Sequence, residues 1–374
     1  MSEVQARLRA ALVAIAEEDV NALYEEEIED AIATLDDGIR PEEDAEGTVS
    51  GACAAVGRLD LLVEARVLGY PWNAKTCANA ASSGYFRILK YAHEHGCPWD
   101  EKTCMDAADG GHLDCLKYAH ENGCPWNTST CSFAANNGHL ECLKYAHERG
   151  CPWDVWTCAH AASNGQLECL KYAHKRGCPW DVWTCRDAAS NGQLECLKYA
   201  HKRGCPWDEE TCWYAAKNGH LECLKYAHEQ GCPWDAKTCW YAAKYGHLEC
   251  LKYAHERGCP WDAKTYFCAM SNGNMEVILF LIEREHPHAQ SLRLTWEKVA
   301  MPILPDADAV IGLEIALSRH RHRHDADGGH VSLREILPFW REHRRLYDEA
   351  HRAARVDASL PEIDEERRRV TDAG

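Results

Sequence analysis

The sequence predicts an all-α protein, a solenoid of about nine helix-turn-helix units stacked on one another. A Pro-Trp step recurs every 27 residues from Trp72 to Trp261, and a fixed period of this size indicates one small unit stacked on copies of itself. Each unit contains two apolar stripes at helical spacing, separated by a glycine. Neither stretch is long enough to form a stable helix alone in water, so stacking has to bury both.

The repeats divide the chain into three predicted parts. These are an acidic helical lead-in (1–46), the repeat solenoid (47–288) and a C-terminal helical segment with a His/Arg linker and a charged tail (289–374). The first unit, from about Thr48 to Gly69, is degenerate and more polar, as expected at the end of a stack. The last begins at Thr265 and has a more apolar second helix.

Both ends outside the repeats contain helical patterns. A helix is expected from Val4 to about Ala16, where Leu8, Leu12 and Ile15 share one face. The acidic stretch after it is expected to be solvated and only partly ordered. Near the other end, an amphipathic helix around Trp340 is expected to fold back on the solenoid.

Two stripes in each unit predict its two helices. In the unit around Gly138, the first stripe contains only small side chains, Cys131, Ala134 and Ala135, so a neighbouring backbone can approach closely. The second stripe contains larger side chains. Its members are Leu140, Leu143, Ala146 and His147, while Glu141 and Lys144 point to water.

The connection to the next unit is short. Gly150 is a natural left-handed C-cap, and the proline that follows Cys151 forces an extended chain. Trp153 is expected to pack over the ends of adjacent helix pairs, and Asp154 or Thr157 to cap the next helix. His147 is expected to hydrogen-bond a loop carbonyl.

This pattern resembles the ankyrin repeat. One matching unit contains Thr238, Ala242, Ala243, Gly246, His247, Leu248, Glu249, Leu251, Lys252, Gly258 and Cys259. The resemblance covers about residues 47–288. The family unit has about 33 residues, so the resemblance implies that its projecting β-hairpin is reduced here to a tight Pro-Trp-Asp loop. Short Cys-Pro-Trp-Asp units look like those in ankyrin proteins of giant viruses of amoebae and some protists.

Charge and hydropathy limit the partners. The net charge is −18, and residues 1–50 supply −12 of it with 15 acidic and 3 basic side chains. This weighs against nucleic acid or an anionic membrane as the main partner. From its first residues we expect no signal peptide, and no stretch approaches the ~20 apolar residues of a membrane helix. We expect an intracellular, cytoplasmic monomer, in the host cytoplasm if the protein is viral.

The 22 cysteines recur at fixed places within helical patterns, which favours reduced thiols that serve as small apolar groups. Equivalent cysteines of neighbouring units should lie ~8–10 Å apart, too far for a disulfide. A Cys/His-based metal-binding or redox-responsive module is the alternative. The nearest zinc-like set is Cys142, His147 and Cys151, but side chains five apart on a helix point away from one another. His320, His322 and His324 could bind a metal adventitiously.

When the repeats are aligned, some equivalent positions (columns) vary from repeat to repeat, while the others are nearly constant. No catalytic constellation or cofactor motif stands out, so we expect no enzyme and no cofactor. The resemblance implies that the loop and first helix line a concave binding surface. We therefore expect non-catalytic binding of another protein, as scaffold, adaptor or decoy. The expected contact residues are Met105, Phe133, Trp156, His160, Trp183, Arg186, Trp213, Tyr214, Trp240 and Tyr241. The alternatives are that these side chains only pack locally, or that the array has no fixed partner.

Overall fold

The computed structural model describes residues 3–17, 25–36, 44, 47–262, 264–265, 268–269 and 272–284. Within these residues the chain consists of helices and turns, without a strand. The predicted linker, amphipathic helix and charged tail of residues 289–374 lie outside them. Among the helices of the described part, none has the length and apolar character needed to cross a bilayer.

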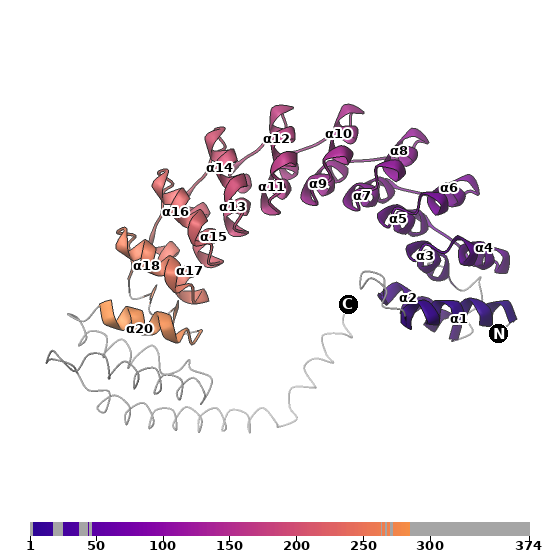
Figure 1. The fold of residues 1–374 in the computed structure, drawn as a ribbon, viewed down its shortest axis with the longest axis horizontal. Coiled ribbons are helices and arrows are strands. Elements are labelled where there is room, and N and C mark those ends of the chain that lie inside the picture. The colour runs from indigo at the N-terminus through magenta and orange to yellow at the C-terminus, as the bar shows by residue number, and fades with distance from the viewer. Residues whose placement is uncertain are drawn as a thin grey trace, which may run out of the picture. The chain divides into compact units, whose positions relative to one another are not determined.

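Helix pairs follow one another along the chain, as predicted (Figure 1). The helices are α1 (Glu3–Glu17), α2 (Glu25–Asp36), α3 (Thr48–Ala55), α4 (Leu59–Leu68), α5 (Ala74–Ser82), α6 (Phe86–Glu94), α7 (Glu101–Asp109), α8 (Leu113–Glu121), α9 (Thr128–Asn136), α10 (Leu140–Glu148), α11 (Val155–Ser163), α12 (Leu167–Lys175), α13 (Val182–Ser190), α14 (Leu194–Lys202), α15 (Glu209–Lys217), α16 (Leu221–Glu229), α17 (Ala236–Tyr245), α18 (Leu248–Glu256) and α20 (Met275–Arg284). The all-α solenoid expected from the 27-residue period is confirmed.

The chain forms two compact units. Unit 1 contains Met1–Ala215 and Glu222–Pro233, and unit 2 contains Ala216–Leu221 and Trp234–Gly374. The predicted borders after residues 46 and 288 stay predictions.

In unit 1 the first helices of the repeats stand side by side in one row and the second helices in another (Figure 1). The backbones of neighbouring first helices lie close together along their length, whereas those of neighbouring second helices approach each other at few points. Side-chain size explains the difference. Cys131, Ala134 and Ala135 on α9 are fully buried, and such small groups allow close approach of backbones.

The loop between repeats is held by the chemistry that the sequence predicted. Gly150 has a φ of 85° after α10, and the Asp154 side chain accepts a hydrogen bond of 3.1 Å from the Trp156 backbone at the start of α11. A further link was not predicted. The Cys151 thiol donates to the backbone carbonyl of Asn127, one repeat earlier, at 3.3 Å. Successive loops are therefore tied to one another.

Histidine and tryptophan form a ladder along the second helices. The ring of Trp153 lies 3.7 Å from that of His147 at an angle of 11°, and its edge contact with Tyr172 of the next repeat spans 6.5 Å. Trp153 thus bridges adjacent helix pairs, as expected. We expected the histidine at this position to hydrogen-bond a loop carbonyl. In two repeats this expectation is wrong, because the Nδ1 atoms of His93 and His201 lie 3.0 and 3.1 Å from tyrosine hydroxyls of the next repeat. The His93 imidazole stacks on Trp99 at 3.7 Å while its Nδ1 atom meets the hydroxyl of Tyr118.

The N-terminal end of unit 1 is more structured than expected. α1 is confirmed, with Leu8 and Leu12 fully buried and Ile15 half-buried. The acidic stretch after it contains α2, which was not predicted. α2 buries Ile28, Ala31 and Leu35 and packs between α1 and α3. Burial of these three apolar side chains stabilises the helix although the residues around them are acidic.

Candidate functional site

The variable aromatic residues of unit 1 lie on its row of first helices. Phe133 belongs to α9, Trp156 and His160 to α11, and Trp183 and Arg186 to α13. Trp156 is 46% exposed and Trp183 is 38% exposed. They are the only exposed tryptophans in the described part of the chain. Because large aromatic side chains are costly to leave in water, this exposure marks a candidate contact surface.

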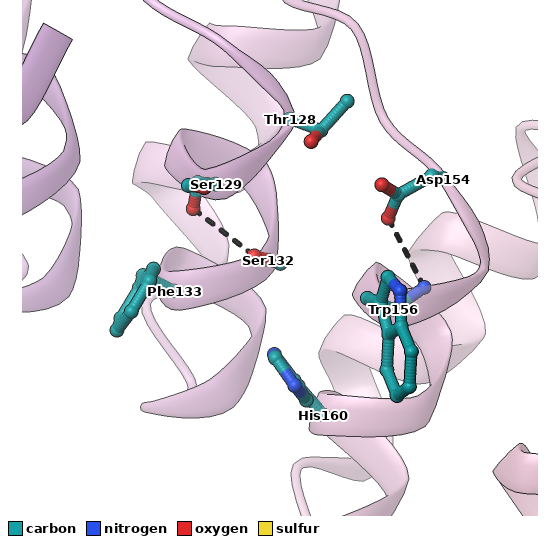
Figure 2. Close-up of a pocket in the computed structure, with 7 residues that line it drawn as sticks. All are labelled: Thr128, Ser129, Ser132, Phe133, Asp154, Trp156 and His160. Carbon is teal, nitrogen blue, oxygen red and sulfur yellow. Dashed lines mark hydrogen bonds between the residues drawn. The ribbon is translucent and has the colours of Figure 1, made fainter. Parts of the chain in front are cut away.

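A hollow of about 360 Å³ opens between α9 and α11 (Figure 2). Trp156 borders it on the α11 side, His160 points from α11 towards α9, and Phe133 adds to the α9 side with its ring turned away from Trp156 and His160. Polar groups complete the lining, namely Thr128, Ser129, Ser132 and Asp154. The volume lies at the lower end of the ~300–1,000 Å³ of ligand pockets.

Most of the hollow is built from columns that change between repeats. Ser129 and Trp156 occupy the position three after the Pro-Trp tryptophan, and Ser132, Phe133 and His160 occupy the two positions after Thr-Cys. Asp154 is instead part of the nearly constant scaffold, because it caps α11. Constant residues therefore set the spacing of the helices, and variable ones set the surface of the hollow.

An aromatic ledge continues from the hollow to α13. The Trp156 ring lies 5.8 Å from that of His160 and 6.4 Å from that of Trp183. The Arg186 guanidinium lies 4.8 Å from the centre of the Trp183 ring. This side of Trp183 is therefore covered by a cation of the chain itself.

Arg186 is neutralised where it stands. It makes a two-pronged ion pair with Asp208 and a second pair of 2.8 Å with Glu210. The hydrogen bond to Asp208 raises the pKa of the guanidinium. Only 13% of the Arg186 side chain is exposed, so it acts as a fixed edge of the ledge and not as a free positive charge.

Two carboxyl groups on the neighbouring first helices, Asp106 on α7 and Asp187 on α13, have altered acidity. Burial raises the pKa of Asp106 to about 6, with a smaller contribution from Asp109. Burial also raises the pKa of Asp187 to about 6, helped by Asp181. Burial lowers the pKa of His160, so its imidazole is neutral at pH 7. The surface thus combines neutral aromatic rings with carboxylates that lack a full compensating charge.

Family models describe the repeats. A model of ankyrin repeats in three copies matches residues 185–264 and 212–291, and a model of ankyrin repeats in many copies matches residues 104–147 and 131–174. The chain is an ankyrin repeat protein. Ankyrin repeats are generally protein–protein interaction modules and are typically non-enzymatic. No curated protein matches the chain.

The other predicted contact residues of this ankyrin array are placed differently. Met105 and Tyr214 are half-buried, and Trp213 is only 8% exposed. In unit 2, Trp240 and Tyr241 are half-buried on α17. The Trp240 indole donates to Asp262 at 2.8 Å, and the Lys264 ammonium lies 3.9 Å from the centre of its ring. Trp213 is therefore used in packing, and the Trp240 indole is engaged by a hydrogen bond within the chain.

The cysteines and histidines of the ankyrin repeats are used in packing. All 22 thiols are buried. Cys142 lies in the core of α10, the Cys151 thiol bonds a loop carbonyl, and His147 stacks on Trp153. Across the described ranges, no three His, Cys, Asp or Glu side chains converge as a metal site would require. His320, His322 and His324 lie outside those ranges.

Sequence reasoning missed the polar half of the hollow. Thr128, Ser129 and Ser132 were passed over because small hydroxyl residues are weak interface markers. Asp106 and Asp187 were passed over for the same reason, since acidic side chains are common on any surface. Their columns carried the signal: each of these five positions changes its residue type from repeat to repeat.

Proposed function

We propose that this ankyrin repeat protein is a non-catalytic binding module, a scaffold, adaptor or decoy, that holds another protein on the first-helix row of unit 1. One observation carries the proposal. The hollow between α9 and α11 is lined almost entirely by positions that vary, on helices whose packing residues do not. Change confined to a surface, on a constant scaffold, is typical of recognition.

Exposure adds a second reason. Trp156 and Trp183 stand next to each other with 46% and 38% of their surface in water. Tryptophan is among the residue types that dominate interface energetics. Covering this ledge with a partner would remove apolar surface from water and would contribute to binding. The 22 buried thiols fit a reducing, intracellular setting, which we include in the proposal.

The test is affinity capture from cells, followed by quantitative mass spectrometry. Trp156→Ala/Trp183→Ala is compared with Glu168→Ala/Glu195→Ala, which changes the second helices of the same two repeats, where both glutamates are exposed. Partners held by the ledge should be lost from the first variant and kept by the control. Unchanged capture by the first variant, with native circular dichroism, would refute the proposal.

A further inference from the structure

Four repeats place one side chain each at the same position along the first-helix row. Residues 106, 133, 160 and 187 are 27 apart and read Asp, Phe, His, Asp on α7, α9, α11 and α13. The hollow lies between the middle two. The helices on either side of this pair, α7 and α13, therefore each carry a carboxyl group at the same repeat position.

The row around the hollow is negatively charged. Helices α7, α9, α11 and α13 with their N-cap residues carry seven carboxylates and two cationic side chains, a net charge of −5. One of the two cations, Arg186, is engaged by Asp208 and Glu210. The other, Lys102, lies at the start of α7. The field at the hollow therefore attracts a positive group.

The acidity of the flanking groups agrees with this field. Asp106 faces Asp100, Lys102 and Asp109, and its pKa is raised by burial and by Asp109. For Asp187 the charged neighbours are Asp181 and Arg186, and burial again dominates. An arriving cation would favour the ionised form of both groups.

We propose that the hollow between α9 and α11 receives a cationic side chain, arginine above all, from a basic segment of the partner. The inference rests on the proposed function and names the chemistry of the partner. A guanidinium lies flat on an indole ring and donates hydrogen bonds at its edge. Trp156 supplies an exposed ring, and Ser129, Ser132 and the Asp154 carboxylate line the same hollow.

Other occupants fit less well. Nucleic acid bases would stack on Trp156 and Trp183, but phosphates need free cations, and Arg186 is paired. An acidic segment would be repelled by the net charge of the row. A purely aliphatic side chain would leave the polar half of the hollow without partners.

Peptides of alternating arginine and glycine serve as the probe, with fluorescence anisotropy as the readout. Matched peptides carry citrulline, which keeps the shape without the charge, or glutamate. The arginine peptide should bind at least about tenfold more tightly than the citrulline peptide near physiological ionic strength. Equal binding of both, or preference for a single-stranded oligonucleotide, would overturn the inference.

Two variants separate the hollow from the general charge of the chain. Trp156→Ala, at an exposed position, should weaken arginine peptide binding about tenfold. Asp106→Asn/Asp187→Asn should weaken it about fivefold. Glu168→Gln/Glu195→Gln removes the same two charges from the second helices and should change it less than twofold. Equal losses in both double variants would show nonspecific attraction and defeat the inference.

The two proposals can fail separately. If Trp156→Ala/Trp183→Ala abolishes partner capture but no arginine preference exists, the binding surface stands and the cationic occupant is wrong. If capture is unaffected by that variant, the proposed function itself fails.

Discussion

The contact between Gly111 and His139 allows a direct test of how repeats are spaced. Gly111 and Gly123 end the two helices of one repeat, with φ values of 75° and 87°. Alanine would meet similar backbone strain at both. A Cβ atom on Gly111 would lie 2.4 Å from the His139 Nδ1 atom of the next repeat, whereas nothing lies within 4 Å of one on Gly123.

The expected costs differ accordingly. The left-handed conformation costs an L-residue about 1–2 kcal/mol, and this is the whole expected effect of Gly123→Ala. Gly111→Ala adds a clash with a rigid ring, and overpacking of this kind costs about 1–3 kcal/mol more. Gly138→Ala introduces a clash with a flexible side chain and not with a ring. The Cβ atom there would meet the Gln166 side-chain end at 2.3 Å, which can move away, so its cost should approach that of Gly123→Ala.

Guanidinium denaturation followed by circular dichroism measures these costs. His139→Ala should relieve the clash, so the Gly111→Ala/His139→Ala pair should show a coupling free energy of about 1 kcal/mol or more. If Gly111→Ala and Gly123→Ala cost the same, or if His139→Ala gives no relief, the His139 ring does not pack closely against Gly111.

Two further predictions concern ionisable groups. Burial raises the pKa of thiols such as Cys142 and Cys169 to about 11. The folded protein should therefore react only slowly with Ellman's reagent at pH 8, whereas all 22 thiols should react once guanidinium has unfolded it. Rapid reaction of several thiols in the folded protein would contradict this. Asp106 and Asp187 have folded pKa values of about 6, above the unfolded value of ~4, so their ionisation destabilises the fold at pH 7 and not below about pH 4. Asp106→Asn and Asp187→Asn should each add about 1 kcal/mol to the free energy of unfolding at pH 7, after allowance for partial exposure, and none at pH 4. Urea denaturation at both pH values measures this difference. Lower stability of the variants at pH 7 would contradict the expectation.

Much of the fold follows from local signals. The 27-residue period, the glycine after each second helix and the Asp or Asn before each first helix were enough to place the helices, because each repeat contacts only its neighbours. The partner of each histidine in the His–Trp ladder could not be predicted from the sequence. Whether His147 meets a carbonyl or the face of Trp153 depends on side-chain direction across two helices, which spacing does not determine.

The site was predicted in part. Column variation identified Phe133, Trp156 and His160, and the structure brings these three to one hollow. The same reasoning gave equal weight to Trp213, which is buried. Column variation shows which residues change, but exposure depends on the neighbours that each repeat supplies, and those include polar residues that resemble ordinary surface.

The thiol–carbonyl bonds between loops give unit 1 unequal stiffness. Bonds such as Cys151 to Asn127 and Cys178 to Asp154, both 3.3 Å, join consecutive loops on the side of the first helices, whereas the second helices are linked mainly through the aromatic side chains of the ladder. A bending load would therefore separate the second helices first. The spacing of the first helices, and with it the width of the hollow, would yield last, so the array can flex elastically while the surface it presents keeps its dimensions.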